Sequence, residues 1–438
     1  FSVALLLPNM AAETHHGSEA VVRLSRFAIF ACCYIESGYV PIAPFLVSRA
    51  EVGVLLSAQY FGGFFVLVPS GLAIDSCGPL PILRRALLAA MGGVLLGALC
   101  PSFWCQLVSR TTLGCAFSGF FNACMALIME RFSEPSRSRH LGSAVGLGTL
   151  GNMVGPPAMG AVYDLAAEGQ QRFWALLHPL LLLALAFWML NAVPPLSKST
   201  QPLLQDSDRH DKVKSEGGPS AFFSKALGVY VAVGLRAWIL ALELVCLFGC
   251  SSASITASAL EMHRRAFSPT AIGLTAIPAG LMQSLFSQWS GRFASSAKNR
   301  EAVLLSCPAI LCVMALCIAG IGFVDCNSLL PILLILMTCS AVNGAADPTS
   351  MSMMADLAKG ASLGYGQAVT ASEMAVALGL GTGPFLAHVM RDKEFSLLCL
   401  LISLVAVLAF VSSFRVLRNI PHNSAEAGEV GEANGAQH

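Results

Sequence analysis

The sequence predicts an all-α membrane protein whose twelve transmembrane helices form two six-helix halves. Three observations lead to this fold class. The composition is strongly apolar, twelve separate apolar runs are each long enough to cross a bilayer, and landmarks of the first six runs recur in the last six.

The composition places the chain in a membrane. Hydrophobic residues make up 55% of its 438 residues and charged residues 12%, whereas soluble domains have about 45–50% apolar and about 25% charged residues. Helices satisfy their own backbone groups, so they can expose this much apolar surface to lipid. The net charge of +1 gives no reason to expect a nucleic-acid partner.

Apolar runs of about 20 residues cover the ~30 Å of bilayer hydrocarbon. In the first half, 27–193, we predict helices at 27–47, 52–72, 82–99, 103–129, 141–165 and 173–193. In the second half, 225–418, we predict helices at 237–260, 270–289, 303–324, 329–354, 363–390 and 395–416.

Three segments that are not predicted to span the membrane flank and separate the two halves. Segment 194–224 is rich in Ser, Asp, Lys, Gly and Pro, too polar to order itself by burial, and we expect a flexible linker. The N-terminal segment 1–26 begins at Phe1, so we expect it to be incomplete, and 419–438 is expected to be a disordered tail. Nineteen Lys and Arg residues lie on the side of the termini and linker and six on the other, which predicts that this side is cytoplasmic.

The fifth predicted helix carries a glycine pattern, Gly142-x8-Gly151-x3-Gly155-Pro156-x2-Met159-Gly160. Small residues at this spacing allow close helix approach, and proline permits a kink. The pattern resembles the antiporter signature of the drug:proton branch of the major facilitator superfamily, with Met159 in place of one glycine. This resemblance implies alternating access and proton-coupled antiport. Gly383-Pro384 repeats Gly155-Pro156 at an offset of 228 residues, as a duplicated half would.

Two shorter patterns agree with this family. Segment 107–114 (LVSRTTLG) is similar to its helix 4 motif and places Arg110 in an apolar helix, and Gly71-x3-Asp75-x2-Gly78 is a reduced form of its loop motif after helix 2. Within the superfamily, the chain resembles the vesicular monoamine and acetylcholine transporters most in Val40-Pro41-x2-Pro44 and in the region of Asp347 and Glu373. That resemblance implies a cationic amine or drug-like solute and an organelle or vesicle membrane, with the plasma membrane left open.

Carboxylates inside predicted helices are the candidate functional groups. An ionised carboxylate at bilayer depth costs at least a few kcal/mol, so it should face a partner or an aqueous cavity. We assign substrate binding to Glu36, near the predicted midplane, and to Asp347. We assign proton coupling to Glu373, Asp347 and Arg110. The conformational motif comprises Gly151, Gly155, Pro156, Gly160, Asp75, Gly383 and Pro384.

Other functions stay open at this point. The acid of helix 1 in the vesicular family falls at Cys32, and its helix 2 lysine falls at Gln59. A non-transporting membrane receptor or scaffold with this fold is therefore one alternative, and a proton symporter of another metabolite is a second. No nucleophile–base or metal-ligand cluster occurs in the sequence, so we expect no enzyme activity, cofactor or metal. Glu243, seven residues after Arg236 on one helix face, is expected to pair with it.

Overall fold

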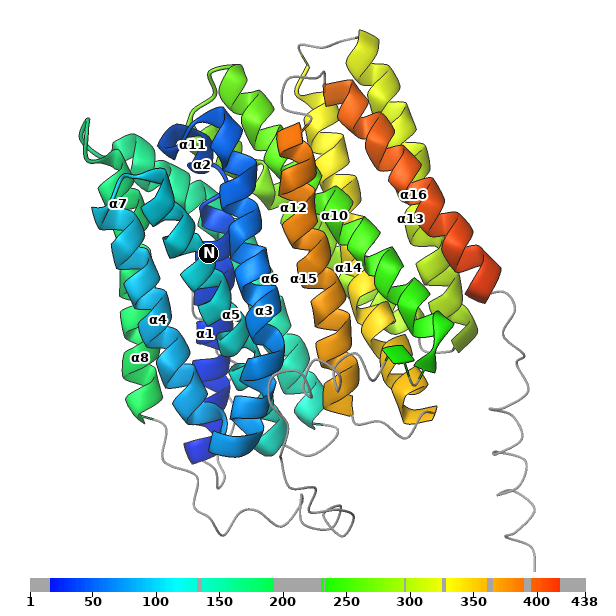
Figure 1. The fold of residues 1–438 in the computed structure, drawn as a ribbon, viewed down its shortest axis with the longest axis horizontal. Coiled ribbons are helices and arrows are strands. Elements are labelled where there is room, and N and C mark those ends of the chain that lie inside the picture. The colour runs from blue at the N-terminus through cyan, green and yellow to red at the C-terminus, as the bar shows by residue number, and fades with distance from the viewer. Residues whose placement is uncertain are drawn as a thin grey trace, which may run out of the picture.

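The computed structural model describes residues 16–131, 136–192, 230–231, 233–294, 297–324, 328–360, 365–389 and 395–417 (Figure 1). The predicted linker, the tail and most of the N-terminal segment lie outside these residues. The described chain forms one bundle of long helices in two groups that lie side by side (Figure 1).

The helices of the first half are α1 (His16–Gly38), α2 (Ala43–Leu46), α3 (Arg49–Cys77), α4 (Pro79–Leu99), α5 (Phe103–Arg131), α6 (Ser136–Leu165), α7 (Gln171–Leu177) and α8 (Pro179–Ala192). The long helices of this half alternate in direction across the bundle, with α7 and α8 forming one span (Figure 1). The end of the bundle where α1 begins and α8 ends is called the linker end here. The other end, where α4 ends and α5 begins, is called the opposite end.

The second half repeats this arrangement. Its helices are α10 (Leu235–Arg264), α11 (Pro269–Leu274), α12 (Ala276–Phe293), α13 (Ala297–Val324), α14 (Leu330–Gly360), α15 (Tyr365–Val389) and α16 (Phe395–Leu417). In the first half α1 packs on α6 and α3 on α5, and in the second α10 packs on α15 and α12 on α14. The duplicated unit predicted from the Gly-Pro landmarks therefore has a counterpart in the packing.

The predicted spans match this bundle, with differences at several ends. The first helix begins at His16, eleven residues before the predicted start, and it ends at Gly38 instead of continuing to residue 47. Two other predicted spans are each divided into two helices, α7 with α8 and α11 with α12. The start of α8 has a local reason, because Pro179 has no N–H to donate and proline suits the first position of a helix.

Local signals explain other helix ends. Ser48 and Glu51 form a capping box at the start of α3, where the Ser48 N–H donates to Glu51 Oε2 at 3.0 Å. Gly78 makes the turn into α4 with φ of 81°, a conformation that glycine adopts without strain. Ser268 caps α11 by accepting a hydrogen bond from the Ala271 N–H at 3.3 Å.

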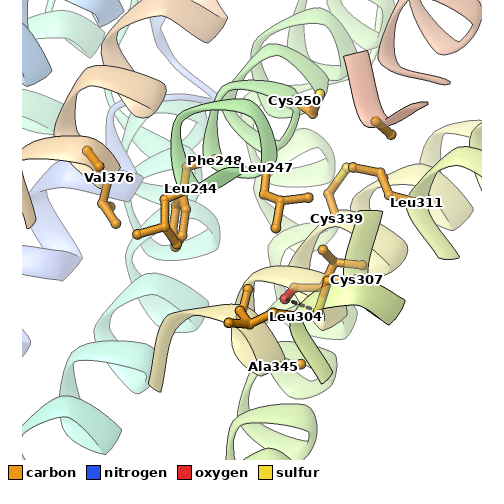
Figure 2. Packing of buried hydrophobic residues seen from close by; sticks show 14 of the residues in the cluster. Leu244, Leu247, Phe248, Cys250, Leu304, Cys307, Leu311, Cys339, Ala345 and Val376 are labelled. Atoms are coloured by element: carbon orange, nitrogen blue, oxygen red, sulfur yellow. Dashed lines mark hydrogen bonds between the residues drawn. The ribbon is translucent and has the colours of Figure 1, made fainter. Parts of the chain in front are cut away.

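Each half has its own apolar core. Figure 2 shows part of the core of the second half, a single cluster of buried residues that includes Leu244 and Leu247 of α10 and Leu304 and Leu311 of α13. Small residues fill the space between the helices, and the Cys307 thiol donates to the Val342 carbonyl at 3.8 Å. Each half is thus packed around a core of its own, which is what movement of the two halves as units would require.

Among the described residues, nine helical segments meet both a length and a hydropathy criterion for crossing a membrane. Three further long helices, α1, α6 and α15, complete the twelve predicted spans. These three helices carry Glu36, the glycine pattern of the fifth predicted helix and Glu373, respectively. Candidate functional residues thus occur in both groups of helices, since Arg110 and Asp347 lie in α5 and α14, which meet the criterion.

Candidate functional site

A cavity of about 300 Å³ lies between the two halves. Its walls come from α1, α3 and α6 of the first half and from α10, α11, α12, α14 and α15 of the second. Most of its polar lining is uncharged. The polar lining residues are Glu36, Ser37, Gln59, Tyr60, Asn152, Ser251, Ser252, Thr256, Ser258, Thr275, Gln283, Ser340 and Asn343.

The halves contact each other closely at the opposite end of the bundle. Asp164, in the last turn of α6, accepts hydrogen bonds from the Thr270 N–H at 3.0 Å and the Thr270 hydroxyl at 2.5 Å. The rings of Phe45 and His263 meet edge to face with centroids 4.3 Å apart. Toward the linker end, α3 and α15 lie side by side (Figure 1), with an apolar contact that includes Met374. The polar contacts between the described parts of the halves are therefore concentrated on one side of the cavity.

The first half presents a carboxylate and a guanidinium to this region. Glu36 lines the cavity together with Tyr60 of α3. Arg110 of α5 is only 2% exposed, interacts electrostatically with Glu36, and donates to Gln59 Oε1 at 3.0 Å. Its Cζ atom lies 3.1 Å from the centroid of the Tyr39 ring. Arg110 is therefore held by an amide and an aromatic face while its charge acts on Glu36.

Glu36 lies further along its helix than the predicted span implied. Because α1 begins at His16, Glu36 is two residues from the end of α1 at Gly38, not nine residues into a longer helix. Its place on the cavity wall between α1 and α3 is nevertheless compatible with the predicted substrate contact.

The second half contributes Asp347 of α14 and Glu373 of α15, which interact electrostatically with each other. Asp347 Oδ1 is buried and accepts no hydrogen bond among the described residues. Asp347 lies one turn toward the linker end from Asn343, and Glu373 lies two turns in the same direction from Leu380. Because Asn343 and Leu380 line the cavity, both acids are placed on its linker side.

The four predicted charged residues form one electrostatic group. Glu373 interacts with Asp347 and also with Glu36 of the other half, and Glu36 interacts with Arg110. Three carboxylates and one guanidinium thus share the region around the cavity.

The glycine pattern brings helices together as expected. A Cβ atom on Gly155 would overlap the Tyr34 carbonyl oxygen of α1, and one on Gly160 would overlap the Pro269 carbonyl oxygen of the second half. Gly151 packs on α1 in the same way, and Pro156 approaches Gly273 of α11. In the second half, Gly383 lies against the Gly249 carbonyl of α10, one residue before Pro384. The pattern thus packs α6 on both α1 and α11, and Gly383-Pro384 packs α15 on α10.

Asp75 and Glu243 are the remaining residues for which the sequence predicted a role or a partner. Asp75 lies in the last turn of α3, but its side chain is outside the described residues. Glu243 does not pair with Arg236 among the described residues, and that expectation is wrong. Its side chain is 1% exposed, inside the helix packing, and its Oε2 accepts a hydrogen bond from the Ser413 hydroxyl of α16 at 2.6 Å.

The sequence did not single out several polar residues of the cavity. Tyr60, Gln283, Ser340 and Asn343 are common helix residues in apolar runs, and only the packing of α3, α12 and α14 shows that they face one space. The Asp164–Thr270 contact was missed because it joins residues 106 positions apart. A polar residue next to a tightly packed helical glycine, as Asn343 is to Gly344, is a signal that could have found one of them.

A family model described as Major Facilitator Superfamily matches residues 26–315, more than half of the chain. The chain belongs to the major facilitator superfamily. No curated protein sequence matches it significantly. Because the superfamily consists of transporters, this chain is a membrane transporter and not an enzyme.

The fold agrees with that of a solved superfamily structure. This structure is the inward-facing, unoccupied form of a bacterial homologue of the human lysosomal transporter Spinster. It matches with a TM-score of 0.67 over 93% of this chain and 98% of that chain, at 14% sequence identity. At this identity the match concerns the fold, so the predicted twelve-helix fold is confirmed, while the predicted branch within the superfamily stays a prediction.

Proposed function

We propose that this transporter exchanges protons for a small organic cation, an amine or drug-like solute, by alternating access. The single observation that carries the proposal is the charge balance at the cavity. Glu36, Asp347 and Glu373 interact with one another or with Arg110, and that guanidinium is the one cation in this electrostatic group of described residues.

Charge neutrality then links the two fluxes. If all three carboxylates are ionised, the guanidinium leaves two negative charges, which are costly at bilayer depth. Protons can neutralise them, and so can a cationic solute. Because the two compete for the same negative charges, binding of one favours release of the other, and this competition is the requirement for antiport.

The positions of the acids suggest which residues bind the cation and which exchange the proton. Glu36 lines the cavity and can contact a bound cation directly, and Asp347, one turn beyond Asn343, can extend that negative surface. Glu373 lies on the linker side, where it can exchange protons as the cavity changes its accessible side. Arg110 acts as the charge partner of Glu36.

The size of the cavity favours a small solute. Its volume of about 300 Å³ lies at the lower end of the usual range for ligand sites, about 300–1,000 Å³. A cationic amine fits both this volume and the resemblance to the vesicular amine transporters. We therefore propose an organelle or vesicle membrane as its location.

The test of proton coupling is Glu373→Gln in proteoliposomes. Gln keeps the volume of the side chain but cannot titrate. We expect loss of uphill accumulation driven by an imposed pH gradient, while solute-for-solute exchange at equal pH survives. Glu243→Gln is the matched control, since Glu243 is also a buried carboxylate but bonds to Ser413 within the helix packing. Normal accumulation in Glu373→Gln would remove Glu373 from the proton step, and loss of both activities would indicate a structural role.

The test of cation binding is Glu36→Gln, measured by calorimetry with the best cationic ligand of the purified protein. Glu36→Gln removes the carboxylate that faces the bound cation and leaves that buried charge unmatched, so we expect affinity to fall at least about tenfold. Affinity for an uncharged analogue should change little. An unaltered affinity for the cation would exclude Glu36 from the binding site.

A further inference from the structure

The two halves share a detailed packing feature on either side of the cavity. In the first half Gly114 of α5 lies against the backbone carbonyl of Gln59 in α3, so close that a Cβ atom would overlap the carbonyl oxygen. In the second half Gly344 of α14 meets the carbonyl of Gln283 in α12 in the same way. Both glutamines line the cavity. Gln59 and Gln283 are therefore equivalent positions of the repeated unit.

Because Gln59 and Gln283 are equivalent, the position in the second half that corresponds to Arg110 can be identified. Arg110 precedes Gly114 by four residues, and Ser340 precedes Gly344 by four residues. In the first half the Arg110 guanidinium donates to Gln59 Oε1. In the second half a short hydroxyl side chain occupies that position, and Ser340 lines the cavity together with Gln283.

The wall around Ser340 has buried acceptor atoms to which no described residue donates. Asn343, next to Gly344, lines the cavity and is 6% exposed, and its Oδ1 accepts no hydrogen bond among the described residues. Asp347 Oδ1, one turn further on, is buried and has no described hydrogen-bond partner either. Buried acceptors of this kind are normally satisfied, so these atoms point to a donor supplied by a ligand.

We infer that Gln283, Ser340 and Asn343 form a subsite for an N–H-rich cationic group of the substrate, a guanidinium or ammonium group. There the substrate supplies the donors that Arg110 supplies in the first half. A guanidinium should bind better than an ammonium group, because its planar N–H groups can reach several acceptors at once. This inference rests on the proposed function and narrows its substrate class. It also places a substrate contact in the second half, opposite Glu36, so that one bound solute joins the two halves.

The decisive variant is Ser340→Arg, which would place in the second half the guanidinium that the first half already has. The purified full-length protein is tested by calorimetry with butylguanidinium, butylammonium and uncharged butylurea. In the wild type we expect affinity to fall in that order. We expect Ser340→Arg to lose at least about tenfold in affinity for butylguanidinium, and Ser340→Ala, which leaves the space open, to lose less than about threefold.

A second pair of variants keeps the test valid if Ser340→Arg fails to fold. Asn343→Leu removes the acceptor at similar size and should weaken butylguanidinium binding about tenfold, whereas Asn343→Asp keeps an acceptor and should retain binding. A thermal melt of each variant separates unfolding from lost binding.

The outcomes separate this inference from the proposed function. If both cations bind the wild type and exchange for protons in proteoliposomes, but Ser340→Arg and Asn343→Leu bind them normally, the subsite is wrong and the proposed function stands. If the wild type binds butylurea as tightly as butylguanidinium, a cationic subsite is wrong. If it binds no probe and transports no cation, both proposals fail.

Discussion

The contact between Asp164 and Thr270 should hold the opposite end of the cavity closed. Asp164 Oδ2 accepts from both the backbone N–H and the hydroxyl of Thr270, and the two residues belong to different halves. An alternating-access cycle must break this contact whenever that end opens. Removing it should therefore shift the conformational balance toward the form that is open at the opposite end.

The magnitude follows from the geometry. Hydrogen bonds to a charged group contribute about 1.5–3 kcal/mol when buried, but Asp164 is exposed, and exposed charge contacts contribute about 1 kcal/mol or less. We therefore assign about 1 kcal/mol to the pair of bonds, which corresponds to about a fivefold change in the ratio of closed to open forms. Thr270→Val removes only the hydroxyl donor and should produce roughly half of this free-energy change.

Distances between spin labels measure this ratio. Labels at Glu168 and at Arg264 report the separation of the halves at the opposite end, since both positions are exposed and lie on different halves. We expect Asp164→Ala to increase the ratio of the long-distance to the short-distance population about fivefold. Thr270→Ser keeps both donors and serves as the matched control.

Two results would refute this reasoning. An Asp164→Ala population equal to that of the wild type would mean that the contact does not contribute to closure. A shift in Thr270→Ser as large as in Thr270→Val would mean that the effect comes from perturbing α11 rather than from losing the hydroxyl donor.

Three further predictions concern packing, burial and topology. Gly155→Ala should lower stability by about 3 kcal/mol because its Cβ would overlap the α1 backbone, whereas Gly146→Ala, with nothing within 4 Å of its Cβ, should melt at or above the wild-type temperature in detergent. Glu243→Met replaces a buried carboxylate, which has one described hydrogen bond, by an apolar side chain of similar size. The melting temperature should therefore stay unchanged or rise. A clear drop in the melting temperature would restore an ionic role for this acid. Single cysteines at Ser207 and Asp392 should react with an impermeant thiol reagent from opposite sides of the membrane, and reaction from the same side would overturn the predicted topology.

The fold was predictable because its signals are local and periodic. A run of about 20 apolar residues specifies a span without reference to any other part of the chain, and the glycine pattern around Gly155 specifies a close helix approach. The errors occurred where neighbouring packing overrides composition. The first helix begins at His16, inside the segment 1–26 that was predicted to precede the first span.

The candidate site was predictable only in part. A charged residue in an apolar run is conspicuous, so Glu36, Arg110, Asp347 and Glu373 could be selected from sequence alone. Which of them interact depends on helix packing, and sequence spacing led to a wrong partner for Glu243. Uncharged polar residues of the cavity carry no comparable signal, because serine and asparagine in membrane helices commonly serve packing.

The two halves share packing contacts but differ in the charged residues that they carry. Gly114 and Gly344 preserve one packing contact, and Gly155 and Gly383 preserve another, so the duplicated halves retain the same helix geometry. The charges do not follow this symmetry: the guanidinium belongs to the first half, whereas Asp347 and Glu373 belong to the second. Because Glu36 and Glu373 belong to different halves, rotation of one half against the other would change the distance between them without changing the packing inside either half. That distance affects how strongly each carboxylate favours a proton, so rocking of the halves can itself alter proton affinity at the cavity.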